Sequence, residues 1–135
     1  MIHHVSFRIP QGRFEDTVAF YELLGFTRIS PPESLVERTV WLEHDATQIH
    51  LQWLEVAEEL SSAHSVGVEG HVALVVSEYL PTLAALEKLG VSFEQRASHW
   101  GSPRCYLRDP AGNKLELMEY PPPNSTPDDD IAQDP

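Results

Sequence analysis

The chain has 135 residues, of which 41% are hydrophobic and 22% charged, a composition typical of one compact globular domain. Its formal net charge of −12 argues against nucleic acid as a partner, because binding to phosphates depends on Lys and Arg. No apolar run approaches the ~20 residues of a membrane-spanning helix. The N-terminus does not resemble a signal peptide, and the single cysteine cannot form an internal disulfide. We therefore expect a cytoplasmic protein that binds neither nucleic acid nor membranes.

The sequence contains an internal repeat, which appears when it is compared with itself at different offsets. The matching segments are 4–9 with 71–76, 23–26 with 88–91, 41–43 with 106–108, and 49–51 with 115–117. The four offsets are 67, 65, 65 and 66 residues (71 − 4, 89 − 24, 106 − 41 and 116 − 50). Since a nearly constant offset over four segments is hard to obtain by chance, we interpret the chain as two copies of one module.

The first module is predicted to be a strand, a helix and three further strands. Residues 2–9 alternate between apolar and polar side chains in the manner of a strand. A helix follows and ends at Gly25. Its apolar residues recur at helical spacing: Phe14, Val18, Tyr21 and Leu24. The remaining strands are predicted at 26–29, 38–43 and 48–54.

The second module repeats this order of elements. Its first strand is predicted at 71–76, and its helix ends at Gly90. The apolar stripe of this helix is predicted to consist of four leucines: Leu80, Leu83, Leu86 and Leu89. Three strands follow at 91–95, 104–108 and 114–120, the last two joined by a turn that contains proline and glycine. The pattern predicts an α+β fold in which two βαβββ modules form a cupped mixed sheet.

The limits of the domain follow from the same pattern. Residues 1–123 are predicted to form one domain, with modules at about 1–54 and 70–121 and a linker at 55–69. Residues 124–135 are polar, acidic and bounded by proline, which is typical of a disordered tail.

Strand alternation separates a helix-covered face from an open face in each module. In the last strand, Leu115 and Leu117 belong under the helix, so Glu116 points to the open face. The same argument places three histidines there: His4, His50 and His71. Because these four residues occupy repeat-related positions and can all bind a metal, we predict that they hold one divalent metal ion. Polar and aromatic residues on the same face are predicted to bind the substrate: Ser6, Trp41, Gln48, Gln52, Arg104 and Tyr106.

Three stretches of the sequence resemble the vicinal oxygen chelate superfamily, which includes glyoxalases, ring-cleaving dioxygenases and bleomycin-resistance proteins. They are the His-Val strand at His4, the second His-Val strand at His71, and the run RDPAGNKLEL at 108–117. The resemblance covers about residues 1–121. It implies that His4, His71 and Glu116 are metal ligands. It also implies that His50 stands where the lyase-type members add a fourth ligand.

Three imidazoles and one carboxylate suit Zn, Ni, Co, Fe or Mn better than Mg or Ca. The leading hypothesis is lyase or isomerase chemistry on a small molecule with two adjacent oxygens, through a metal-stabilised enediolate. Glu116 or His50 would move the proton, and both are candidate catalytic residues. If His50 does not bind the metal, the other three ligands form the facial triad of an Fe(II) ring-cleaving dioxygenase. A third hypothesis is a non-catalytic small-molecule-binding protein of the bleomycin-resistance kind.

A half-barrel of this kind leaves strand edges that favour pairing between chains, so we expect a homodimer. Two arrangements stay open at this point: each metal site is completed either within one chain or between two chains.

Overall fold

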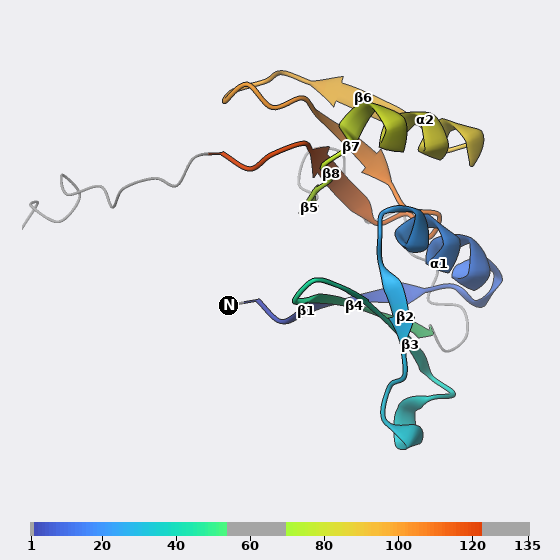
Figure 1. Ribbon diagram of the computed structural model, residues 1–135. Coiled ribbons are helices and arrows are strands. Elements are labelled where there is room, and N and C mark those ends of the chain that lie inside the picture. Colours follow the sequence, from blue (N-terminus) through green and yellow to red (C-terminus); the bar gives the residue numbers. More distant parts are fainter. Residues whose placement is uncertain (1, 54–69, 123–135) are drawn as a thin grey trace, which may run out of the picture.

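The structure is a computed structural model that describes residues 2–53 and 70–122 (Figure 1). The predicted linker at 55–69 and the predicted acidic tail at 124–135 lie outside the described residues. Among the residues that are described, no helix is long and apolar enough to cross a membrane.

Each half of the described chain folds into one βαβββ unit. The elements of the first unit are β1 (His4–Ile9), α1 (Phe14–Leu23), β2 (Thr27–Ile29), β3 (Thr39–His44) and β4 (Thr47–Trp53). The elements of the second are β5 (Val72–Val75), α2 (Tyr79–Lys88), β6 (Phe93–Arg96), β7 (Arg104–Arg108) and β8 (Lys114–Met118). Short 3₁₀ turns at Gln11–Arg13 and Glu33–Leu35 precede α1 and β3. The predicted order of elements is confirmed, and only the ends of some elements differ from the prediction.

The two units form two mixed sheets of the same topology. Sheet A has the strand order β1-β4-β3-β2 and sheet B the order β5-β8-β7-β6. In each sheet the first and last strands of the unit run parallel, and the other pairs are antiparallel. Trp41 lies opposite His50 in sheet A, as Tyr106 lies opposite Glu116 in sheet B. The internal repeat therefore holds in the strand register, and the predicted α+β fold class is confirmed.

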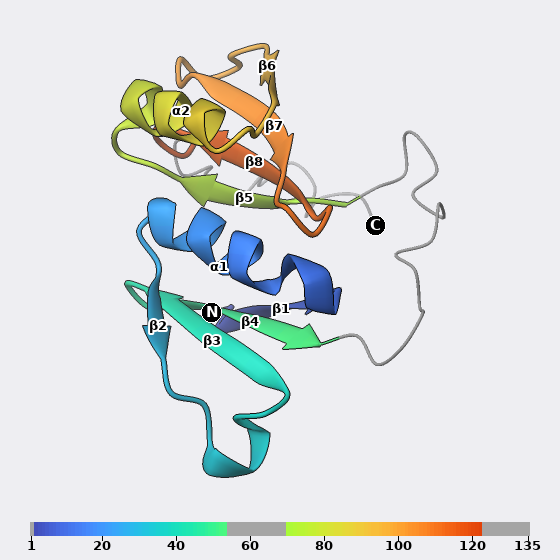
Figure 2. The same ribbon diagram turned by 90° about the vertical axis from the view of Figure 1, so that its right-hand side faces the viewer.

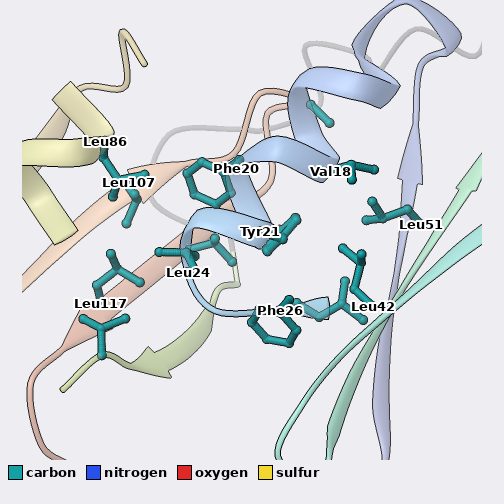
Figure 3. Close-up of a cluster of buried hydrophobic side chains, with 14 of the residues drawn as sticks. Val18, Phe20, Tyr21, Leu24, Phe26, Leu42, Leu51, Leu86, Leu107 and Leu117 are labelled. Atoms are coloured by element: carbon teal, nitrogen blue, oxygen red, sulfur yellow. The ribbon is translucent and has the colours of Figure 1, made fainter. Parts of the chain in front are cut away.

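Helix α1 lies between the two sheets (Figures 1 and 2). This position explains why its buried residues cover more than one narrow stripe: Phe14, Thr17, Val18, Phe20 and Tyr21. Val18 points toward Leu51 of sheet A, whereas Phe20 lies beside Leu107 of sheet B (Figure 3). The buried side chains of both units consequently form a single hydrophobic core.

Helix α2 differs from the predicted leucine stripe. Leu83 and Leu86 are buried, but Leu80 is 71% exposed and Leu89 is 53% exposed. The reason is geometric, because each three-residue step falls about 60° short of a full helical turn. Four residues spaced in this way therefore point in different directions around the helix. The buried face instead begins with Tyr79, which lies one turn before Leu83.

The β7–β8 hairpin is tied to helix α1 through the buried carboxylate of Asp109. Its Oδ1 accepts hydrogen bonds from the backbone N–H groups of Ala111 and Asn113, at 3.0 and 2.9 Å. Its Oδ2 accepts one from the amide of Asn113 at 2.9 Å and one from the Tyr21 hydroxyl at 2.6 Å. Gly112 adopts a φ of 95°, which a turn of this shape requires. The contact with Tyr21 therefore fixes the second unit against the first.

Candidate functional site

The open face of sheet A presents a stack of three aromatic rings. The imidazole of His50, on β4, lies 4.0 Å from the Trp41 ring with an interplanar angle of 1°. The ring of His4, on β1, lies 4.1 Å from His50 at 14°. Because β4 runs between β1 and β3, His50 is the middle ring of the stack. The predicted ligands His4 and His50 are thus brought together.

The stack restricts the chemistry of His50. Its side chain is buried, and its Nε2 lies 2.9 Å from Oε1 of Gln48. Burial lowers the pKa of His50, and the nearby charges of His4 and His3 lower it further. A lowered pKa keeps the imidazole neutral at physiological pH, which is the form that binds a metal.

The open face of sheet B presents the second predicted ligand pair. Nε2 of His71 lies 3.0 Å from Oε2 of Glu116. The other carboxylate oxygen, Oε1, accepts a hydrogen bond of 2.8 Å from Nη1 of Arg104. Nε of Arg104 donates to the carbonyl oxygen of Ala97 at 2.7 Å. Arg104 and Glu116 therefore form a buried ion pair, and the hydrogen bond to Glu116 is the main reason why the pKa of Arg104 is raised.

The His71–Glu116 pair fits a metal ion. Two ligands at right angles on an ion, each with a bond of about 2.1 Å, lie about 3 Å apart. The observed Nε2–Oε2 distance matches this value, and Oε2 is the carboxylate oxygen that Arg104 does not contact. Glu116 can consequently keep its bond to Arg104 while it binds a metal through Oε2.

The four predicted ligands form two pairs on different sheets. Within residues 2–53 and 70–122 of one chain, no group of three or more His, Cys, Asp or Glu side chains is placed to hold a metal ion. Each pair alone supplies two donors, fewer than the three or four protein ligands of ordinary catalytic metal sites. A site shared by His4, His50, His71 and Glu116 thus stays a prediction.

The predicted substrate residues surround both pairs. Ser6 and Gln52 are exposed on sheet A beside the ring stack, and Gln48 also donates to Oε2 of Glu43 at 2.9 Å. On sheet B, the Tyr106 ring lies 5.1 Å from the His71 ring. Arg104, in contrast, points its guanidinium at Glu116 rather than into open space.

Two cations beside Tyr106 were missed at the sequence level. Nζ of Lys114 lies 4.5 Å from the centre of the Tyr106 ring, and the guanidinium of Arg96 lies 5.1 Å from it. Lys114 stands on the same face of β8 as Glu116 by alternation, and this signal was available. The position of Arg96 depends on the pairing of β6 with β7, for which the sequence carried no distinct signal.

Comparisons with known proteins give a consistent result. The sequence profile of the Glyoxalase/Bleomycin resistance protein/Dioxygenase superfamily matches residues 1–117. Among solved structures, a glyoxalase family protein from Bacillus anthracis is similar, with 28% identity and a TM-score of 0.68 over 87% of this chain and 93% of that one. A lactoylglutathione lyase from Agrobacterium tumefaciens has 19% identity and a TM-score of 0.60, with coverages of 87% and 92%. A glyoxalase/dioxygenase from Nostoc punctiforme has 14% identity and a TM-score of 0.68, with coverages of 87% and 89%. No curated protein matches this chain.

Proposed function

Since this chain belongs to the Glyoxalase/Bleomycin resistance protein/Dioxygenase superfamily, we propose that it is a divalent-metal-dependent enzyme acting on a small molecule with two adjacent oxygens. The reaction class is that of a lyase or isomerase. The observation that carries the proposal is the pairing of metal-binding side chains on each open face, with the His71–Glu116 spacing of 3.0 Å expected for neighbouring ligands.

The complete site is assembled from two chains. Sheet A of one chain supplies His4 and His50, and sheet B of its partner supplies His71 and Glu116. Strands β1 and β5 each have one neighbouring strand among the described residues, so both are free edges at which a second chain can dock. A homodimer then contains two equivalent sites.

The metal, one of Zn, Ni, Co, Fe or Mn, would polarise the two substrate oxygens. This would make the C–H bond next to them easier to deprotonate. Glu116 is the candidate proton acceptor, by partly leaving the metal, because Arg104 contacts only its Oε1. His50 is the alternative, since its lowered pKa keeps a nitrogen lone pair available. Tyr106 and Trp41 form aromatic walls that orient an apolar part of the substrate.

Arg104 acts on Glu116 in this proposal and does not bind the substrate directly. Its guanidinium holds Oε1 and leaves Oε2 directed at the metal position. Arg104 is therefore a positioning residue. We also propose a cytoplasmic location, because the one cysteine of the chain, Cys105, is a buried free thiol.

A second candidate function is Fe(II)-dependent ring cleavage. It is favoured by the contact of His50 Nε2 with Gln48, which keeps that nitrogen away from a metal and leaves His4, His71 and Glu116 as the ligands. A third is binding without catalysis, which is favoured by the ion pair that already neutralises Glu116. Anaerobic reconstitution with iron followed by oxygen-uptake measurements distinguishes the second candidate from a lyase.

Metal analysis of mixed dimers tests the two-chain site. One variant carries His4→Ala and His50→Ala, and the other carries His71→Ala and Glu116→Gln. Each alone is expected to lose the metal, whereas a refolded equal mixture regains roughly a quarter of the wild-type content, because half of the dimers contain one intact site of two. A wild-type protein that takes up no metal from any of the five ions supports the binding protein instead. Full metal content in either variant would refute the ligand set.

A further inference from the structure

A cavity of about 810 Å³ lies at the seam between the two units, and none of the predicted metal ligands lines it. Helix α1, the segment that joins α2 to β6, and the β7–β8 hairpin border this space. Its volume falls within the roughly 300–1,000 Å³ typical of small-molecule sites. The seam cavity is therefore large enough for a ligand that the metal site does not account for.

Part of the cavity wall is apolar. Leu89 and Val91 contribute from the segment that joins α2 to β6, and Phe93 contributes from β6. Leu89 is 53% exposed, and Val91 and Phe93 pack against the hydrophobic core while staying partly accessible. An accessible apolar wall that contains a phenyl ring favours a ligand with a flat hydrophobic body.

The charges around the cavity differ from those of the whole chain. Only nine residues of the chain are Lys or Arg, and three of them line this space: Arg13, Arg108 and Lys114. The acidic residues that line it already have partners. Asp16 pairs with Arg13 at 3.7 Å, Glu94 pairs with Arg96 at 2.8 Å, and Asp109 is buried in its hairpin bonds. Of the cations, Arg13 is held by Asp16, and Arg108 donates to the carbonyl oxygen of Gly112 at 2.9 Å. The lining therefore balances three cations with three carboxylates, unlike the acidic chain as a whole, and Lys114 is the lining cation that can receive an anion.

Lys114 is the cation best placed to receive an anion. Its ammonium group lies on the Tyr106 ring, and both side chains line the cavity. No carboxylate within the described residues lies at ion-pair distance from its Nζ. An ammonium group without a carboxylate partner gains a charge-assisted hydrogen bond when an anion arrives.

We propose that the seam cavity is a second ligand site, which shares Tyr106 with the proposed metal site but does not need the metal, for a small organic monoanion with a flat apolar body. The carboxylate of the ligand lies at Lys114, and its body lies against Leu89, Val91 and Phe93. The ligand is thus a monocarboxylic acid with an aromatic or planar hydrocarbon part.

Titration calorimetry on the EDTA-treated protein tests this site without involving the metal. The probe is 3-phenylpropionate, and the matched neutral probe is 3-phenylpropanamide, which has nearly the same shape. The acid is expected to bind about tenfold more tightly than the amide, the order of one charge-assisted hydrogen bond. Equal binding of the two probes, or no binding of either, overturns the proposal.

Three substitutions locate the binding. Lys114→Met keeps the aliphatic stem, so it should remove the tenfold preference and leave amide binding unchanged. Lys88→Met is the control, because Lys88 is the only other lysine, stands at the end of α2 and does not line the cavity. Ala19→Leu fills the space from an exposed helix position and should weaken both probes severalfold.

Two outcomes speak against the site. If Lys88→Met weakens the acid as much as Lys114→Met, the effect belongs to the overall charge and not to the cavity. If Ala19→Leu binds both probes as the wild type does, the ligand lies elsewhere. Because the protein is metal-free throughout, a chain that fails to bind metal leaves these expectations unchanged.

Discussion

The surroundings of Glu116 show how one carboxylate can serve two partners. Arg104 contacts Oε1 and His71 contacts Oε2, and the side chains of Arg104 and Glu116 are 10% and 7% exposed. A buried carboxylate without a compensating charge is strongly unfavourable. Arg104 therefore supplies the compensating charge beside Glu116 in the metal-free chain.

Removal of Arg104 tests this role. In metal-free protein, Arg104→Met should lower the free energy of unfolding by about 3 kcal/mol, because it leaves the charge of Glu116 buried without its partner. The double variant Arg104→Met/Glu116→Gln should recover most of the loss, since no buried charge remains. Urea denaturation of the wild type, both single variants and the double variant measures the coupling. Additive losses would contradict a direct ion pair.

Tyr21 is the second residue whose environment makes a sharp prediction. Burial raises its pKa well above the usual value, and the negative charge of Asp109 and the hydrogen bond to it raise it further. The hydroxyl stays neutral in the folded protein at a pH where an unfolded tyrosine ionises. The stability that this contributes is complete below about pH 10 and is lost as the pH rises further.

The variant Tyr21→Phe should therefore have two effects. At pH 7 it loses one hydrogen bond to a carboxylate, which lowers the free energy of unfolding by about 2 kcal/mol. At about pH 11 the difference from the wild type should shrink, because only the wild type gains from ionisation of Tyr21 on unfolding. Denaturation curves at both pH values measure it. A difference that stays constant would mean that the hydroxyl does not titrate as its burial requires.

At the scale of the elements, helix α2 offers a matched pair of leucines. Leu86 is fully buried and lies beside Leu107 in the core, whereas Leu80 is mostly exposed (Figure 3). Leu86→Ala should lower the free energy of unfolding by about 2–5 kcal/mol, and Leu80→Ala should change it by less than about 0.5 kcal/mol. Thermal and urea denaturation check both values. Equal losses would restore the leucine stripe predicted from the sequence.

The contrast shows what the sequence can predict about elements. Strand faces were predictable because alternation has a period of two, and the repeat supplied each strand pattern twice. The predicted leucine stripe of α2 was wrong, because residues spaced three apart do not follow the helical period of 3.6 residues. The double burial of α1 was not foreseen, since it depends on how one unit packs on the other.

The candidate site also has a part that the sequence predicts and a part that it does not. Each pair of ligands was predictable because the members of a pair stand on neighbouring strands in fixed register. The distance between the pairs depends on the packing of the sheets, which no local pattern encodes. The contacts of Arg104 and Lys114 depend on side-chain conformations as well, so their roles emerged only from the structure.

At the scale of the whole molecule, the free strand edges predict the state of assembly. The wild type should have a mass of about 30 kDa in solution, twice the 15.2 kDa of one chain. Val75 is half-exposed on the edge strand β5, so Val75→Lys should shift the protein toward the monomer and reduce its metal content.

Leu80→Lys is the control for this substitution, because it places the same charge on an exposed leucine of α2, away from the edges. Light scattering coupled to gel filtration measures the mass of each variant. A monomeric wild type that retains its metal would contradict the two-chain site.

Helix α1 has a consequence for the history of the repeat. The two repeat-related helices differ in their packing, because α1 is packed from both sides and α2 presents one flank to water. Substitutions on that flank of α2 meet no neighbour, whereas changes at the buried positions of α1 disturb one sheet or the other. The halves are therefore free to diverge at different rates, and the second helix is where relatives of this chain should vary most.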